Sequence, residues 1–131
     1  VIVASGPGEQ DYYASRSTED HVAILLSYTG ETHETIGDAK LCRYGGTKTI
    51  SITSFGQNSL SEACDYNFFI PPWEKYYSKI GQFASSAGFS YILDLFYSGI
   101  FEKDYLANYE YLLEHTGRLS MVHINKKMND I

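Results

Sequence analysis

The sequence predicts an α/β domain whose sheet contains parallel strands. An apolar run, Ala23–Leu26, ends at Ser27 in hydroxyls and a glycine, and a helical pattern starts at Glu31 or Thr32. A short apolar run bounded in this way is typical of a buried parallel strand that leads into a helix. A second strand is expected from Thr47 to Ser54, so strand, helix and strand fit within roughly 30 residues, as in a right-handed βαβ unit.

The length and composition indicate one soluble globular domain. The chain has 131 residues, 44% of them hydrophobic and 20% charged, which is enough for a single core and too few for two ordinary domains. Its net charge of −6 argues against a nucleic-acid-binding surface on this chain, because phosphate contacts need clustered Lys and Arg. DNA binding by a segment absent from this chain stays open. No apolar run reaches the roughly 20 residues of a membrane helix, and no signal-peptide pattern opens the sequence.

The cysteines and histidines suggest neither a disulfide nor a metal site. Cys42 and Cys64 form no motif and fall in predicted helices. We therefore expect reduced, buried thiols in a cytoplasmic protein. The four histidines lack the spacing of metal ligands, and we expect neither a metal nor another cofactor.

Local signals define the segments before the first strand of this unit. Val1–Val3 is apolar and suits the middle of a sheet, whereas Ser5–Asp11 is expected to be a loop because it contains Gly6-Pro7-Gly8. A short helix is expected near Asp11–Ser17, and a polar turn then leads into the strand His21–Ser27.

Helix and strand signals continue in the middle of the chain. A helix is expected from about Thr32 to Arg43, where two glycines follow. Ser59-Leu60-Ser61-Glu62 has the pattern of a capping box, with Ser59 as the cap, and starts a short helix through Cys64. The strand Tyr66–Ile70 ends before two prolines, which cannot continue a ladder.

The last third of the sequence predicts two helices rich in aromatic residues. The first, from about Tyr77 to Phe101, has an apolar face so wide that we expect burial on more than one side. Its outer residues, Tyr91 and Phe96 among them, are expected to meet a symmetry mate or the terminal helices. The second runs from about Lys103 to His115 and is expected to break at Thr116-Gly117.

The hydroxyls after the first buried strand predict a phosphate-binding loop. Ser27, Thr29 and Thr32 can each donate an O–H to a phosphate oxygen, and Gly30 lets the backbone approach a ligand closely. The helix that follows offers free N–H groups and the positive end of its dipole. The alternative is that Thr29 or Thr32 simply caps the helix, which would explain one hydroxyl and leave two over.

These motifs together resemble the sugar isomerase (SIS) domain over roughly residues 1–101. The resemblance is carried by the loop Ser27-Tyr28-Thr29-Gly30-Glu31-Thr32, the strand and turn Ile50–Gly56, the stretch Asn58–Asp65 and the strand that ends at Pro71. Within that superfamily the sequence is most similar to the effector domain of RpiR-type transcriptional regulators. The family's first strand, with its part of the phosphate site, and the helix-turn-helix of these regulators have no counterpart before Val1.

The resemblance implies a three-layer, doubly wound α/β/α sandwich that binds a phosphosugar at the carboxyl ends of its strands. The family's phosphate-binding positions correspond to Ser27, Thr29, Gly30 and Thr32, with the Tyr28 amide as a further donor. Ser54 and Glu31 are weaker candidates for contacts with the sugar. Residues 1–101 would form this domain and residues 102–131 a helical extension.

Two main functions follow from this resemblance. The first is a sensor that binds a phosphorylated sugar and acts as a homodimer on DNA, through a domain absent from this chain and without a membrane partner. The alternative is an aldose–ketose isomerase, because enzymes share the scaffold. A structural interaction module without ligand ranks last.

An isomerase needs a base that moves a proton between adjacent carbons. Glu31, His33 and Glu74 are the candidates near the loop, but each has a simpler explanation. Glu31 favours the positive end of a helix dipole, His33 is typical of a solvated helix residue, and Glu74 of a surface loop. We therefore assign no catalytic residue.

Without the family's central strand, the sheet would have two open edges. Three outcomes would relieve this: Val1–Val3 moves in beside the strand Ala23–Ser27, another chain lends a strand, or the N-terminal segment peels away. We expect the first, because the segment is apolar and its connection is long enough. The sheet of this chain would then have four strands.

Overall fold

The computed structural model describes residues 1–54, 56–72 and 83–122. By its contacts the chain divides into two units, Val1–Tyr91 and Ile92–Ile131, which are treated separately below. The division falls inside a helix, and the expected boundary after residue 101 stays a prediction.

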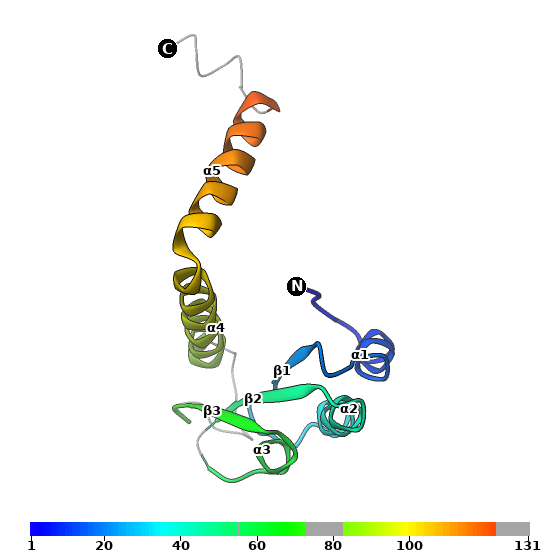
Figure 1. Cartoon of the computed structure of the whole chain (residues 1–131). Helices are drawn as coiled ribbons and strands as arrows, with labels where there is room; N and C mark the ends of the chain where they lie inside the picture. Colours follow the sequence, from blue (N-terminus) through cyan, green and yellow to red (C-terminus); the bar gives the residue numbers. More distant parts are fainter. Residues whose placement is uncertain (55, 73–82, 123–131) are drawn as a thin grey trace. The chain divides into compact units, whose positions relative to one another are not determined.

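Three parallel strands form the sheet of the first unit. They are β1 (Val22–Leu26), β2 (Lys48–Ser54) and β3 (Tyr66–Ile70), in the order β1-β2-β3 (Figure 1). Ile24 pairs with Ile50, and Ile50 pairs in turn with Tyr66. Helices flank this sheet, so the predicted α/β class with parallel strands is confirmed, and each predicted strand between residues 21 and 70 lies within one residue of its observed bounds.

The helices are α1 (Pro7–Ala14), α2 (His33–Tyr44), α3 (Ser59–Ala63), α4 (Phe83–Lys103) and α5 (Tyr105–Val122). The prediction for α2 is correct to one residue at each end. Residues 77–82 of the predicted long helix lie outside the described residues, and the rest of that helix is α4.

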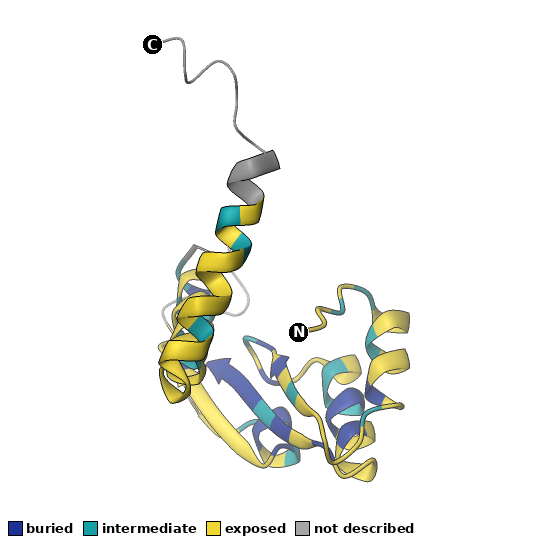
Figure 2. Ribbon diagram, turned by 45° about the horizontal axis from the view of Figure 1, so that its top comes forward, coloured by how far each residue is buried: buried dark blue, intermediate teal, exposed yellow. Residues whose placement is uncertain are grey.

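The core lies between one face of the sheet and helices α2 and α3. Leu25 of β1 packs there with Ala39, Leu60 and Cys64, all of them buried. Both cysteines are free and buried as expected, and desolvation raises the pKa of each thiol. The buried residues gather on the central strand β2, as Figure 2 shows.

Strand β2 turns hydroxyls toward this core, and their hydrogen bonds hold the next strand. Thr49 donates through its backbone N–H and its hydroxyl to Oδ2 of Asp65, both at 2.9 Å. Ser51 donates to Oδ1 of Asn67, the residue with which it pairs in the ladder. Because these hydroxyls are buried and satisfied, they add specificity to the pairing of β2 with β3 without the cost of an unpaired polar group.

Val1–Val3 does not join the sheet, which has three strands in the part of the chain that the structure describes. All three side chains are exposed, and Val22, Ile24 and Leu26 of β1 are exposed on the face away from α2. The expected pairing does not form because the segment between Val3 and β1 contains helix α1, which packs on α2. A three-residue strand would also gain too few hydrogen bonds to offset its ordering.

Three local predictions are corrected by the structure. The segment expected to be a loop, Ser5–Asp11, contains most of α1, because Pro7 occupies the first turn, where its missing N–H costs nothing. The capping box of α3 is made by Asn58 and Ser61 and not by Ser59 and Glu62. Helix α5 continues through Thr116-Gly117, since one glycine costs a helix only about 1 kcal/mol.

A buried carboxyl, Asp38 of α2, lies against α1. It is 5% exposed, and among the described residues its Oδ1 has no hydrogen-bond partner. Desolvation and the contact with Asp11 raise its pKa to about 6, and the charge of Glu34 acts in the same direction. The folded chain thus binds a proton here that the unfolded chain has already lost between about pH 4 and pH 6.

We predict that Asp38→Asn stabilises the fold at pH 7.5, by about 1–3 kcal/mol, because burial disfavours the ionised Asp38 carboxylate and its carboxyl neighbours repel it. Since the folded pKa is raised, wild-type stability should fall as pH rises toward 6, and the advantage of the variant should disappear near pH 4. Urea unfolding between pH 4 and 8 measures both. Asp20→Asn, at an exposed loop position, is the control. Equal pH dependence of Asp38→Asn and wild type would contradict the prediction.

Candidate site at the carboxyl edge of the sheet

The loop after β1 turns sharply and enters α2 at Thr32. Gly30 has a φ of 71°, a left-handed conformation that other residues adopt only with strain. Oγ of Ser27 lies 2.9 Å from Oγ1 of Thr32 and accepts a hydrogen bond from the Gly30 N–H at 3.1 Å. Oγ1 of Thr29 accepts from the Glu31 N–H at 3.1 Å. The structure therefore brings the three predicted hydroxyl residues into one short turn.

Thr32 occupies the N-cap position of α2 but does not cap the helix with its side chain. Its hydroxyl pairs with Ser27, and among the described residues no side chain caps α2. The simple capping interpretation is thus not what the structure adopts. The N–H groups of the first helical turn have no intrahelical partners and point out of the N-terminal end of the helix. This end is also the positive end of the helix dipole.

The loop after β2 lies beside this turn. The Ser54 N–H donates to the Tyr28 carbonyl at 2.9 Å, and the Leu60 N–H donates to the Gly30 carbonyl at 2.9 Å. Ser54 is almost completely buried, whereas Thr29 and Thr32 are exposed. The predicted residues Ser27, Tyr28, Gly30 and Ser54 are therefore held together at the carboxyl edge of the sheet, where open α/β sheets bind ligands.

Glu31 bridges the two loops. Its Oε1 accepts from the Ser59 N–H at 2.9 Å and its Oε2 from the Ser59 hydroxyl at 2.7 Å. These bonds lower the pKa of Glu31, so the group is a bound carboxylate at neutral pH. His33 is exposed at the start of α2, and Glu74 lies outside the described residues.

Sequence reasoning missed Asn58 and Ser59 as parts of this site. Asn58 caps α3 and lies against Gly30, and Ser59 holds Glu31. The available signal was Asn58, one position before the cap residue that was predicted, because asparagine is as good an N-cap as serine.

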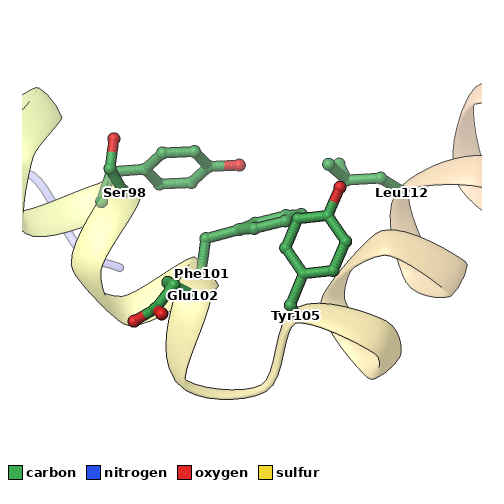
Figure 3. Close-up of a pocket in the computed structure, with 6 residues that line it drawn as sticks. Ser98, Phe101, Glu102, Tyr105 and Leu112 are labelled. Atoms are coloured by element: carbon green, nitrogen blue, oxygen red, sulfur yellow. The ribbon is translucent and has the colours of Figure 1, made fainter.

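Among the described residues, no group of three His, Cys, Asp or Glu side chains could hold a metal ion. No described helix is both long and apolar enough to cross a bilayer. A groove of about 350 Å³ lies within the helical unit (Figure 3). It is lined mainly by the aromatic rings of Tyr97, Phe101 and Tyr105 and by Leu112.

The fold and this edge define a class of protein: a parallel α/β domain with a glycine-containing, hydroxyl-rich turn at a helix N-terminus. The sequence matches the SIS domain family over residues 1–93. The chain belongs to the SIS domain family, and the resemblance predicted from its motifs is confirmed.

The relatives in this family include transcriptional regulators. The chain is 32% identical over 104 residues to an uncharacterized HTH-type transcriptional regulator of Caldanaerobacter subterraneus subsp. tengcongensis, covering 79% of this chain and 36% of that protein. It is 28% identical over 90 residues to another of Clostridium perfringens, covering 69% and 32%. The chain therefore spans about a third of the length of these relatives.

A solved structure shares the fold over nearly the whole chain. The Vibrio vulnificus NanR protein complexed with ManNAc-6P superimposes with a TM-score of 0.81 at 22% identity, over 95% of this chain and 46% of that one. At this identity the likeness concerns the fold alone.

We predict that Gly30→Ala destabilises the fold, by about 1–3 kcal/mol, because alanine strains a left-handed backbone. In addition, its Cβ would lie 2.0 Å from Oδ1 of Asn58. Gly37→Ala in α2 is the matched control. Apart from its chain neighbours and the helix's own backbone, no atom lies within 4 Å of a Cβ at residue 37, and alanine there should stabilise the helix by about 0.5–1 kcal/mol. Urea unfolding compares the two variants, and equal effects would show that the turn imposes no constraint.

Proposed function

We propose that this chain is the sugar-phosphate-sensing effector domain of an RpiR-type transcriptional regulator. The HTH-type regulators among its relatives support the regulatory role. NanR, which has the same fold, is a protein complexed with a sugar phosphate. The chain would bind the phosphorylated sugar in the cytoplasm, and DNA would be bound by a domain outside these 131 residues.

The observation that carries the proposal is the uncapped N-terminus of α2 beside the hydroxyl turn. Two hydroxyls carry two protons, and the pair Ser27–Thr32 uses one of them internally, which leaves one O–H for a ligand oxygen. The Thr29 hydroxyl accepts from a backbone N–H and so keeps its own proton. Together with helix amides, these donors suit a phosphate group.

The proposed contacts follow from this geometry. Phosphate oxygens would be bound by the Thr29 hydroxyl, by the one O–H that the pair Ser27–Thr32 leaves free, and by the backbone around Tyr28 and Gly30. Ser54 is next to Tyr28 and is the weaker candidate for the sugar. Glu31 is the other weaker candidate for a contact with the sugar. Both of its carboxylate oxygens already accept hydrogen bonds from Ser59, so a sugar hydroxyl would have to approach the exposed side of the carboxylate.

For the isomerase alternative, the contacts of the candidate base Glu31 argue against catalysis. Glu31 is engaged by Ser59, and its lowered pKa makes it a poor proton acceptor for carbon acids at neutral pH. We therefore propose a sensor without catalysis, in which ligand binding shifts an equilibrium between conformations.

We predict that Thr32→Val weakens binding of ManNAc-6P by about 1.5–3 kcal/mol, the value of a hydrogen bond to a charged group. Stability should change far less, because the helix keeps its backbone bonds. Isothermal titration of wild type and variant measures the affinity, with inorganic phosphate and hexose phosphates as further probes. Thr116→Val, at an exposed position of α5, is the control.

Two outcomes would contradict this function. Unchanged affinity of Thr32→Val would remove the hydroxyl from the site. Turnover of a bound sugar phosphate to its ketose or aldose, abolished by Glu31→Gln or Glu74→Gln, would favour the isomerase.

We also infer that the regulator is a homodimer joined through its helical unit. Phe96 of this unit is half-buried, and Tyr91, the last residue of the first unit, is exposed. Helix α5 carries an apolar stripe at positions that repeat every three to four residues. The opposite face holds Glu114 and Arg118, which are paired. The stripe consists of Tyr105, Leu106, Tyr109, Leu112 and Leu113, all exposed. A charge-free stripe of this kind suits a twofold contact with a second copy.

We predict that Leu106→Glu, which places a charge on this stripe, converts a dimer into a monomer at micromolar concentration. Light scattering coupled to gel filtration measures the mass. Ala107→Glu adds the same charge on the polar face of the same helix and should leave the dimer intact. A monomeric wild-type protein, or a dimer of Leu106→Glu, would show that the stripe is not the interface.

A further inference from the structure

The side chain of Asn58 lies directly against the turn at Gly30. A Cβ at Gly30 would be 2.0 Å from Oδ1 and 2.1 Å from Cγ of Asn58, closer than any two such atoms approach. The Leu60 N–H, two residues further on, donates to the Gly30 carbonyl at 2.9 Å. The backbone of Gly30 is thus packed between its own loop and the start of α3.

Asn58 is itself fixed by hydrogen bonds to three elements. Its Oδ1 accepts from the Ser61 N–H at 2.9 Å, which caps α3. Its Nδ2 donates to Oγ1 of Thr53 at 2.9 Å and to the Gly56 carbonyl at 3.1 Å. Both amide protons are therefore used within the protein, and the side chain has no donor left for a ligand.

These contacts connect the end of β2 to the turn after β1. Thr53 is completely buried within β2, so this hydrogen bond ties Asn58 to the central strand of the sheet. If the Asn58 side chain moved away, it would leave a space next to Gly30. The Gly30 N–H, which donates to the Ser27 hydroxyl, would then be less firmly held.

We propose that Asn58 is a positioning residue for the phosphate site: it holds the Gly30 turn in the shape that directs the free O–H of the pair Ser27–Thr32 and the amides of α2 toward a common anion. The inference rests on the proposed function for its ligand. It goes further in assigning the shape of the site to a residue that the ligand does not touch.

Asn58→Ser tests this role without removing the helix cap. Serine is a good N-cap, so α3 keeps its capping bond, while the contacts with Gly30 and Thr53 are lost. Ser61→Ala is the matched control, because it breaks the reciprocal half of the capping box and leaves Asn58 against Gly30. A residue that only stabilised α3 would give the two variants similar effects.

The expected result has two parts. Asn58→Ser should weaken binding of ManNAc-6P and of inorganic phosphate about fivefold or more, a coupling typical of residues in direct contact, and Ser61→Ala less than about twofold. In the ligand-free protein, hydrogen exchange at the Gly30 and Glu31 amides should accelerate in Asn58→Ser and stay unchanged in Ser61→Ala.

A double-variant cycle adds a test of the contact itself. Gly30→Ala should lower the melting temperature less in the Asn58→Ser background than in wild type, because the space beside residue 30 is then open. Part of the effect should remain, since alanine still strains the left-handed backbone.

Each outcome decides one claim. Equal affinity of wild type and Asn58→Ser, or equal exchange at Gly30 in both, would overturn the positioning role. If wild type binds neither probe, the proposed function is rejected together with the ligand part of this inference. The exchange measurements and the double-variant cycle then still decide whether Asn58 holds the turn.

Discussion

The hydrogen bonds between the loops that follow β1 and β2 are the constraint on which the candidate site depends. The carbonyls of Tyr28 and Gly30 accept from Ser54 and Leu60, and the Glu31 carboxylate accepts twice from Ser59. Parallel strands end at the same edge, so the pairing of β1 with β2 brings these loops together. The turn after β1 is consequently shaped by α3 as well as by its own residues.

Much of the fold could be predicted because its signals are local. The strand Tyr66–Ile70 was predicted to the residue, since Pro71 and Pro72 cannot continue a ladder. The hydroxyl turn was recognisable from the abrupt change after Leu26, and helix α2 follows at the expected position. Val1–Val3 was misplaced for the opposite reason: its apolar composition carries no information about where α1 directs the chain.

The remaining parts of the site depend on contacts between residues far apart in sequence. Nothing in the local pattern of Asn58 indicates that it lies against Gly30, and nothing in Glu31 indicates a bond to Ser59, 28 positions away. Local reasoning assigned Glu31 to the helix dipole of α2, whereas the structure uses it to hold the start of α3. Such pairs become visible only when the sheet has set the register of both loops.

The hydroxyl pair Ser27–Thr32 gives the turn a shape that does not require a ligand. The pair uses one of its two protons internally, so the turn gives up one donor for a fixed geometry. A preorganised site loses less conformational freedom on binding, and the donors that remain include backbone amides, which have little freedom to lose. An anion at this edge would thus meet donors whose positions are already fixed: the amides at the start of α2 and the hydroxyls of the turn. Asn58 would act on this site through the Gly30 backbone, which it contacts.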